Sequence, residues 1–249
     1  MWIPEYVTTF QIILLFLCAL LIGMTKSGLS GAGLMIVPIM ANIFGSREST
    51  GIVLPMLITA DIFAVTYYNR HAHWKYILRL MPWAILGVGG GLYFGKHVND
   101  HVFSNILVAI VVMGIGLMLY GDLRKKSAVI PDYWWFSMAL GVGGGFTSMV
   151  GNAAGPILML YLLSMRLPKN AFIGTGAWFF FILNLTKVPV HIVSWHTITL
   201  DTLKINLLCV PFIIAGIITG IFTVKLFKET AYRYFIIIST LISAIFLLI

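Results

Sequence analysis

Four glycines, three hydroxyl side chains and one lysine lie together in the stretch Gly23-Met-Thr-Lys-Ser-Gly-Leu-Ser-Gly-Ala-Gly33. Backbone amides and hydroxyls can donate hydrogen bonds to an oxyanion, and a lysine adds positive charge. Helix capping and packing of small residues are the alternative use of such side chains. We predict that this stretch binds an anionic substrate through Lys26, Ser27, Gly28, Ser30, Gly31 and Gly33.

A looser version of this stretch begins at Gly141. Each version lies between two short apolar runs. In the first version, 10–23 and 34–44 would rise about 21 Å and 17 Å as helices, less than the ~30 Å of a bilayer core. Such interruptions in corresponding places of two halves point to the binding site of a transporter. The second version adds four residues to the predicted site: Thr147, Ser148, Gly151 and Asn152.

Three more polar residues lie inside apolar segments. Lys187 has Asn184 three residues earlier on the same helical face, and Asp61 occupies the corresponding zone of the first half. Such groups are expensive in a bilayer and are usually functional or paired. We predict that Asn184 and Lys187 bind substrate and that Asp61 binds a coupling ion, a proton or sodium. A structural ion pair of Asp61 with Lys187 or Lys26 is the alternative.

The composition places all of these groups in a membrane protein. The chain has 249 residues, of which 60% are hydrophobic and 10% charged, and its mean hydropathy is +0.99. A soluble domain of this size would expose a largely apolar surface. Long apolar runs predict helices rather than a β-barrel, so the fold class is an all-α polytopic membrane protein.

Charges and sulfur atoms add no further function class. The net charge of +8 comes mostly from short loops, where Lys and Arg set topology, so no nucleic-acid partner is predicted. Cys18 and Cys209 lie in apolar runs and are interpreted as small core residues. No cofactor and no metal site are predicted, because the histidine pairs have no cluster of further ligands; these pairs are His71 with His73 and His191 with His196.

The chain reads as one transmembrane domain, 1–249, made of two halves. Repeat one covers 8–121, a polar linker covers 122–132, and repeat two covers 133–249. Each half has five apolar segments and starts with the interrupted pair. Several residues correspond between the halves, such as Gly23 with Gly143, Gly51 with Gly174, Asp61 with Asn184, and Pro82 with Pro211. These matches indicate a duplication.

Loop charges predict the orientation. If each interrupted pair enters and leaves on one side, as a re-entrant hairpin or as two short spans, eleven basic residues fall on one side and three, Arg47, Lys96 and Lys204, on the other. If each pair were a single broken span, the count would be seven against seven. The positive-inside rule favours the first arrangement. It places both termini outside and inverts the two repeats, so that the interrupted pairs enter from opposite faces. If the pairs are re-entrant, their glycine-rich tips approach each other near the midplane. The second arms, starting near Gly33 and Pro156, would aim their N-termini at one spot.

The sequence allows two other interpretations. Gly28-Leu-Ser30-Gly31 is a GxSG motif like that of rhomboid-type intramembrane proteases, with Ser30 as nucleophile and His191 as base, although the second tip lacks the serine. A non-transporting membrane sensor is the other alternative. The aromatic group Trp178 to Phe181 is expected at the membrane interface or facing lipid.

The run Gly-x-x-x-Ser27-Gly28-x-x-Gly31-x-Gly33-x-x-x-x-Pro38, repeated loosely at 143–156, resembles the sulfite exporter TauE/SafE family, also called the 4-toluene sulfonate uptake permeases. The chain is similar to that family in length, segment count and internal duplication. The resemblance implies a non-enzymatic permease of the cell membrane for sulfur-containing anions such as sulfite, thiosulfate or organosulfonates. In such a secondary transporter the tips would hold the oxyanion, and the binding site would open alternately to the two sides of the membrane.

Overall fold

The structure is a computed structural model that describes residues 7–29, 33–97, 134–165 and 167–226, and residues 102, 109, 228, 231 and 238 singly. Within these residues every element is a helix and no strand occurs. The elements are α1 (Thr9–Lys26), α2 (Gly33–Phe44), α3 (Ser46–Tyr68), η2 (Asn69–His71), α4 (Trp74–His97), α6 (Trp134–Gly151), α7 (Gly155–Ser164), α8 (Lys169–Pro189), η3 (Val190–Ser194) and α9 (Leu200–Leu226). Apart from single residues, the predicted segments 102–121 and 232–249 and the linker 122–132 lie outside the described residues.

Five of the described helices are long and apolar enough to cross a membrane. They are α1, α3, α4, α9, and α8 together with the turn η3. The arms α2 and α7 have 12 and 10 residues. They therefore rise only about 18 Å and 15 Å, against ~30 Å of hydrocarbon. The prediction of an all-helical, polytopic membrane protein is confirmed.

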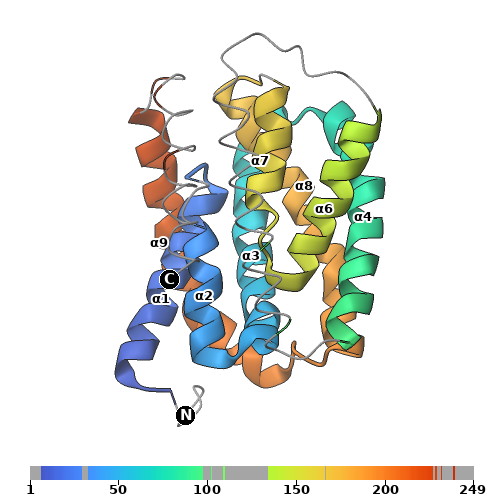
Figure 1. Cartoon of the computed structure of the whole chain (residues 1–249). Coiled ribbons are helices and arrows are strands. Elements are labelled where there is room, and N and C mark those ends of the chain that lie inside the picture. Colours follow the sequence, from blue (N-terminus) through green and yellow to red (C-terminus); the bar gives the residue numbers. More distant parts are fainter. Residues whose placement is uncertain are drawn as a thin grey trace.

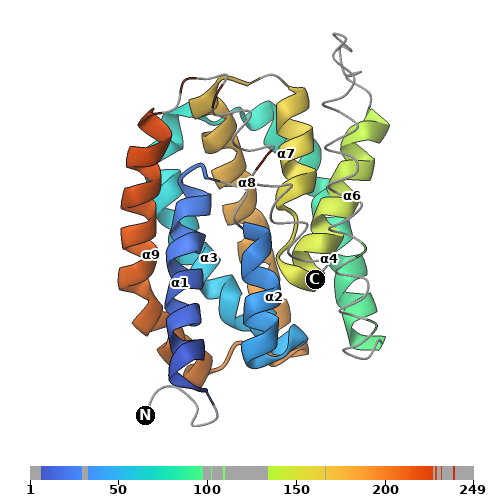
Figure 2. The same ribbon diagram turned by 60° about the vertical axis from the view of Figure 1, so that its left-hand side comes forward.

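The two short arms form hairpins that point in opposite directions. In Figure 1, α1 rises from the bottom and α2 returns to it, whereas α6 descends from the top and α7 returns to it. The tips of the two hairpins therefore enter the interior from opposite ends of the molecule. Figure 2 shows α3 and α8 behind both hairpins, and these two helices run antiparallel and pack against each other.

Sequence-local signals fix two helix ends. At the start of α1, the Thr8 side chain accepts a hydrogen bond from the amide of Gln11 at 3.3 Å, and the Gln11 side chain accepts one from the amide of Thr8 at 3.0 Å. This capping box satisfies two backbone donors that the helix leaves open. At the end of α8, Pro189 is followed by the π-helical turn η3. Proline has no amide hydrogen, so it interrupts the regular hydrogen-bond pattern of α8 there.

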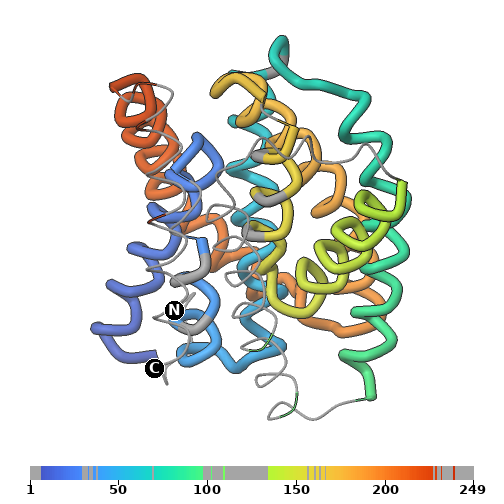
Figure 3. The backbone as a smooth tube through the Cα atoms, turned by 45° about the horizontal axis from the view of Figure 1, so that its top comes forward, coloured from blue at the N-terminus to red at the C-terminus, as the bar shows by residue number. Residues whose placement is uncertain are grey.

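Glycines allow two pairs of helices to approach closely. Between α4 and α6, a Cβ atom at Gly145 would overlap the carbonyl group of Ala84. Between α1 and α9, a Cβ atom at Gly23 would overlap the carbonyl oxygen of Ile213, and one at Gly216 that of Leu20. Small residues are the usual means by which membrane helices bring their backbones together. Figure 3 shows α4 beside α6 on one side of the molecule and α1 beside α9 on the other.

The described apolar core has two main clusters. One is built largely from α4, α6, α7 and α8, and the other from α1, α2, α3 and α9. The hairpins thus lie one in each cluster, with α3 and α8 in contact between them. This arrangement makes α3 and α8 the common wall against which both hairpin tips are positioned.

Candidate functional site

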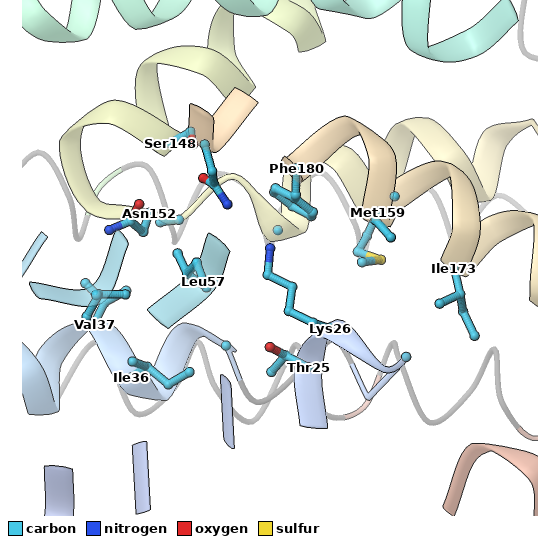
Figure 4. Close-up of a pocket in the computed structure, with 18 of the residues that line it drawn as sticks. Thr25, Lys26, Ile36, Val37, Leu57, Ser148, Asn152, Met159, Ile173 and Phe180 are labelled. Atoms are coloured by element: carbon cyan, nitrogen blue, oxygen red, sulfur yellow. The ribbon is translucent and has the colours of Figure 1, made fainter. Parts of the chain in front are cut away.

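A cavity of about 90 Å³ lies where the two hairpin tips meet α3 and α8 (Figure 4). A single water molecule needs only about 10–15 Å³ of such space, so the cavity has room for a small ligand. Its wall includes residues of both tips, namely Thr25, Lys26, Gly28 and Gly33 from the first and Ser148, Asn152, Ala153 and Gly155 from the second. The first residues of both short arms, Gly33 of α2 and Gly155 of α7, border the same space.

Lys26 forms an ion pair across this wall. It lies in the last turn of α1, and its Nζ is 2.8 Å from Oδ1 of Asp61 on α3. The other carboxylate oxygen, Oδ2, accepts a hydrogen bond from Nδ2 of Asn184 at 2.7 Å. The Asp61 side chain is 0% exposed and that of Lys26 9%. Of the two ion pairs that the sequence left open for Asp61, the structure contains the one with Lys26.

Lys187 has a different environment. Its Nζ donates to the carbonyl oxygen of Ser148 at 3.1 Å, to Oγ of Ser148 at 2.9 Å and to Oδ1 of Asn152 at 2.7 Å. Three acceptors match the three N–H groups of an ammonium ion. All three are uncharged, and the lysine is fully buried. Lys187 therefore brings a positive charge to the second tip. The three acceptors solvate this charge but do not neutralise it.

Asn152 connects three elements at the second tip. It has a positive φ of 55°, a conformation that asparagine adopts more readily than most residues. Its Oδ1 accepts from Lys187 on α8, and its Nδ2 donates to the carbonyl oxygen of Thr50 on α3 at 3.1 Å. The amide side chain thereby fixes the second tip between α3 and α8.

The structure describes four of the remaining predicted residues. The hydroxyl of Ser27 donates to the carbonyl oxygens of Gly23 and Met24, and that of Thr147 donates to the carbonyl oxygen of Gly144. Both hydroxyls therefore bond within their own helices rather than into the cavity. Gly151 is buried at the end of α6. Gly28, with a φ of 120°, borders the cavity, while Ser30 and Gly31 lie outside the described residues.

Sequence reasoning missed Phe180. The group Trp178 to Phe181 was expected at the interface or facing lipid, but Phe179 is buried and Phe180 lines the cavity. The ammonium of Lys26 lies 4.1 Å from the centroid of the Phe180 ring. Figure 4 shows these two side chains pointing toward each other in the pocket. The expectation was wrong for these two residues. A signal was present, because residues 180, 184 and 187 recur at the spacing of one helical face.

His191 is part of the packing below Lys187. It is fully buried, its Nδ1 lies 2.8 Å from Oγ1 of Thr197, and its ring meets the ring of Trp195 edge to face. Among the described residues, no group of three or more His, Cys, Asp or Glu side chains is placed to hold a metal ion. Cys18 and Cys209 are both buried free thiols, as expected for small core residues.

The charged residues lie deep within their helices. Asp61 lies seven residues before the end of α3, about 10 Å along its axis, and Lys187 lies seven residues before the end of η3. Intramembrane ionisable side chains of this kind usually face an aqueous cavity or one another. Multiple apolar spans around a small cavity lined by both hairpin tips define a polytopic membrane protein with a polar, charged centre.

Comparison with family models then gives the family. The model described as Sulfite exporter TauE/SafE matches residues 15–247, so this chain belongs to that family of membrane transporters. Neither the curated proteins nor the solved structures compared with the chain gave a match. The family match confirms the resemblance drawn from the glycine-rich stretches, and it gives no support to a rhomboid-type protease acting through Ser30.

Proposed function

We propose that this protein is a secondary transporter that moves small sulfur-containing anions across the plasma membrane by alternating access. Sulfite, thiosulfate and organosulfonates are the proposed substrates, because the family suggests sulfur and the site suggests an anion. One observation carries the proposal most directly. Hairpin tips that enter from opposite ends line a single cavity, and Lys26 stands in its wall.

The cavity offers the groups that an oxyanion needs. Lys26, Ser148, Asn152 and Asn184 border it, and Lys187 lies behind Ser148 and Asn152. Charge-assisted hydrogen bonds to such donors are roughly twice as strong as neutral ones. The helices α2 and α7 also begin at the cavity wall, and the N-terminus of a helix favours negative charge. The apolar remainder of the wall, including Phe180, would strengthen these electrostatic contacts by excluding water.

Alternating access would use two inverted five-segment repeats, 8–121 and 133–249, with both termini outside. Three features support the inversion. The hairpins point in opposite directions, the corresponding residues Asp61 and Asn184 are in contact, and glycines occupy the close approaches of both α4–α6 and α1–α9. Within this proposal Asp61 binds the coupling ion. Its ion pair with Lys26, which borders the cavity, supports this assignment.

Ligand-induced stabilisation of purified protein tests the proposed site. Thermal unfolding would be followed with sulfite, thiosulfate, sulfate and taurine, and a ligand at ~100 times its Kd should add about 2.7 kcal/mol. The test variant is Lys26→Gln with Asp61→Asn, which removes both charges without leaving one unpaired. The matched control is Lys204→Gln with Asp201→Asn, an exposed ion pair of 2.7 Å.

We expect selective stabilisation by a sulfur oxyanion in the wild type and the control, and its loss in the test variant. No stabilisation by any of the four compounds would refute a sulfur-anion site. Counterflow of labelled anion into liposomes then separates transport from sensing, since a sensor would bind the anion without moving it. Equal binding by the test variant would refute the placement of the site at Lys26.

A further inference from the structure

The two oxygens of the Asp61 carboxylate both face hydrogen-bond donors. Oδ1 faces the ammonium of Lys26 at 2.8 Å, and Oδ2 accepts from the amide nitrogen of Asn184 at 2.7 Å. A bound metal cation needs several oxygen ligands around it, and these neighbours present nitrogen and positive charge instead. The surroundings therefore do not suit sodium at Asp61. A proton needs no shell of oxygen ligands, and the carboxylate can take one up once the ammonium of Lys26 turns to an anion in the cavity.

The charges at the cavity do not balance among the described residues. Lys26 and Lys187 contribute two positive charges and Asp61 one negative charge, so the centre carries a net charge of +1. The other described acidic residues, Glu48 and Asp201, lie in the first turns of α3 and α9, both are exposed, and Asp201 pairs with Lys204. They leave Asp61 as the described acid that can adjust the charge of the site.

We propose that Asp61 is the proton-binding residue of this transporter and that the charge of the substrate sets the proton count. A dianion is carried together with one proton on Asp61, and a monoanion is carried without a proton. The inference rests on the proposed function, because it assumes that the anion binds in the cavity beside Lys26.

In this proposal the ammonium group of Lys26 changes its partner from Asp61 to the bound anion. A dianion that enters the cavity attracts Lys26 and places negative charge beside the buried Asp61 carboxylate. Two like charges in a site of low dielectric repel each other strongly, so the carboxylate takes up a proton from the water of the open cavity. No other bond changes. When the cavity opens to the opposite side, the anion leaves, the proton dissociates, and Asp61 pairs with Lys26 again.

With this stoichiometry the loaded centre is neutral for both substrate classes. A dianion and one proton cancel the net charge of +1, and a monoanion alone does so. A neutral centre has the smallest desolvation penalty while the cavity is closed to water on both sides. The groups that face Asp61 in the described structure are Lys26 from α1 and Asn184 from α8, with Lys187 further along α8. Asn184 does not titrate, so the candidates for the proton are the carboxylate and the two lysines, and the Asp61→Asn variant distinguishes the carboxylate from the lysines.

Proton uptake on binding tests the inference directly. Purified wild-type protein in weakly buffered solution, with a pH indicator, would receive thiosulfate as the dianion or methanesulfonate as the monoanion. We expect uptake of about one proton per bound thiosulfate and none per bound methanesulfonate. The variant Asp61→Asn, which resembles the protonated acid in shape and charge, should bind thiosulfate without proton uptake and should exchange labelled thiosulfate between liposomes and medium.

The outcomes separate the two levels of the proposal. Thiosulfate binding without proton uptake, uptake with methanesulfonate, or uptake that persists in Asp61→Asn would overturn the proton assignment and leave the transporter standing. Absence of binding by either anion would overturn the proposed function and this inference with it. The wild-type measurement stands alone should Asp61→Asn fail to fold, and Lys204→Gln with Asp201→Asn is the control for altered surface charge.

Discussion

Breaking the ion pair between Lys26 and Asp61 should destabilise the protein in an unequal way. The perturbations are Lys26→Met, Asp61→Asn and the double variant. The two side chains are 9% and 0% exposed, and their charged atoms are 2.8 Å apart. At an effective dielectric constant of about 20, that distance corresponds to a Coulomb attraction of about 6 kcal/mol. Desolvation offsets much of this attraction, so the pair contributes far less in total.

Each single variant leaves one buried charge without its partner. Loss of one partner of a buried pair typically costs about 3–5 kcal/mol. Lys26→Met should lie at the upper end, because the stranded Asp61 is fully buried, although Asn184 still donates to it. Asp61→Asn should lie at the lower end, because Lys26 borders the cavity and its ammonium can be hydrated there. The double variant should be close to the wild type, which gives a coupling energy of about 3 kcal/mol or more.

The free energy of unfolding would be measured in mixed micelles by titration with a denaturing detergent, with helical circular dichroism as the signal. Parallel cycles on the exposed pair Lys204 and Asp201 provide the control, for which a coupling of about 0.5 kcal/mol is expected. Additive single variants would refute the claim that the pair acts as a unit. A larger loss for Asp61→Asn than for Lys26→Met would refute the claim that the cavity hydrates the lysine.

Three further changes test the packing and the second tip. Gly145→Ala should destabilise the protein by about 1–3 kcal/mol because its methyl group meets the backbone of α4, whereas Gly89→Ala, which has open space, should be neutral or slightly stabilising in the same detergent titration. Lys187→Met should weaken anion binding at least about tenfold, as measured by thermal shift, and unchanged affinity would remove Lys187 from the site. Thr197→Val should lower stability by about 1 kcal/mol through loss of its hydrogen bond to His191, and an effect on anion affinity instead would contradict the structural role given to this pair.

Much of the candidate site could be predicted from the sequence, because the signal lies within single segments. A polar residue inside an apolar segment is visible in the sequence alone, which identified Asp61, Asn184 and Lys187. Helical spacing put Asn184 and Lys187 on one face. In the structure Lys187 contacts the second tip and Asn184 contacts Asp61 on α3. The same spacing includes Phe180, which was missed because an aromatic residue in a membrane helix carries no polar signal of its own.

Partner choice was decided by tertiary structure. Lys26 and Lys187 were equal candidates for Asp61, since the sequence contains no distance between helices. Because α1 and α8 pack against α3, Asp61 forms its ion pair with Lys26. Lys187 instead donates hydrogen bonds to neutral acceptors at the second tip. Hydroxyl direction was also beyond the sequence. The hydroxyls of Ser27 and Thr147 could donate either to a ligand or to their own helix. In the structure both donate to backbone carbonyl oxygens one turn earlier.

The sequence by itself therefore determined that this chain is an all-helical membrane protein, where its helices are interrupted, and which polar groups lie at depth. Those features depend on composition and on the rise of a helix, which are properties of a single segment. The tertiary structure decided that both interruptions border one cavity and which charges pair across it. These contacts join residues that are far apart in the chain, Asp61 and Asn184 among them, and only the packing of the helices sets their distances.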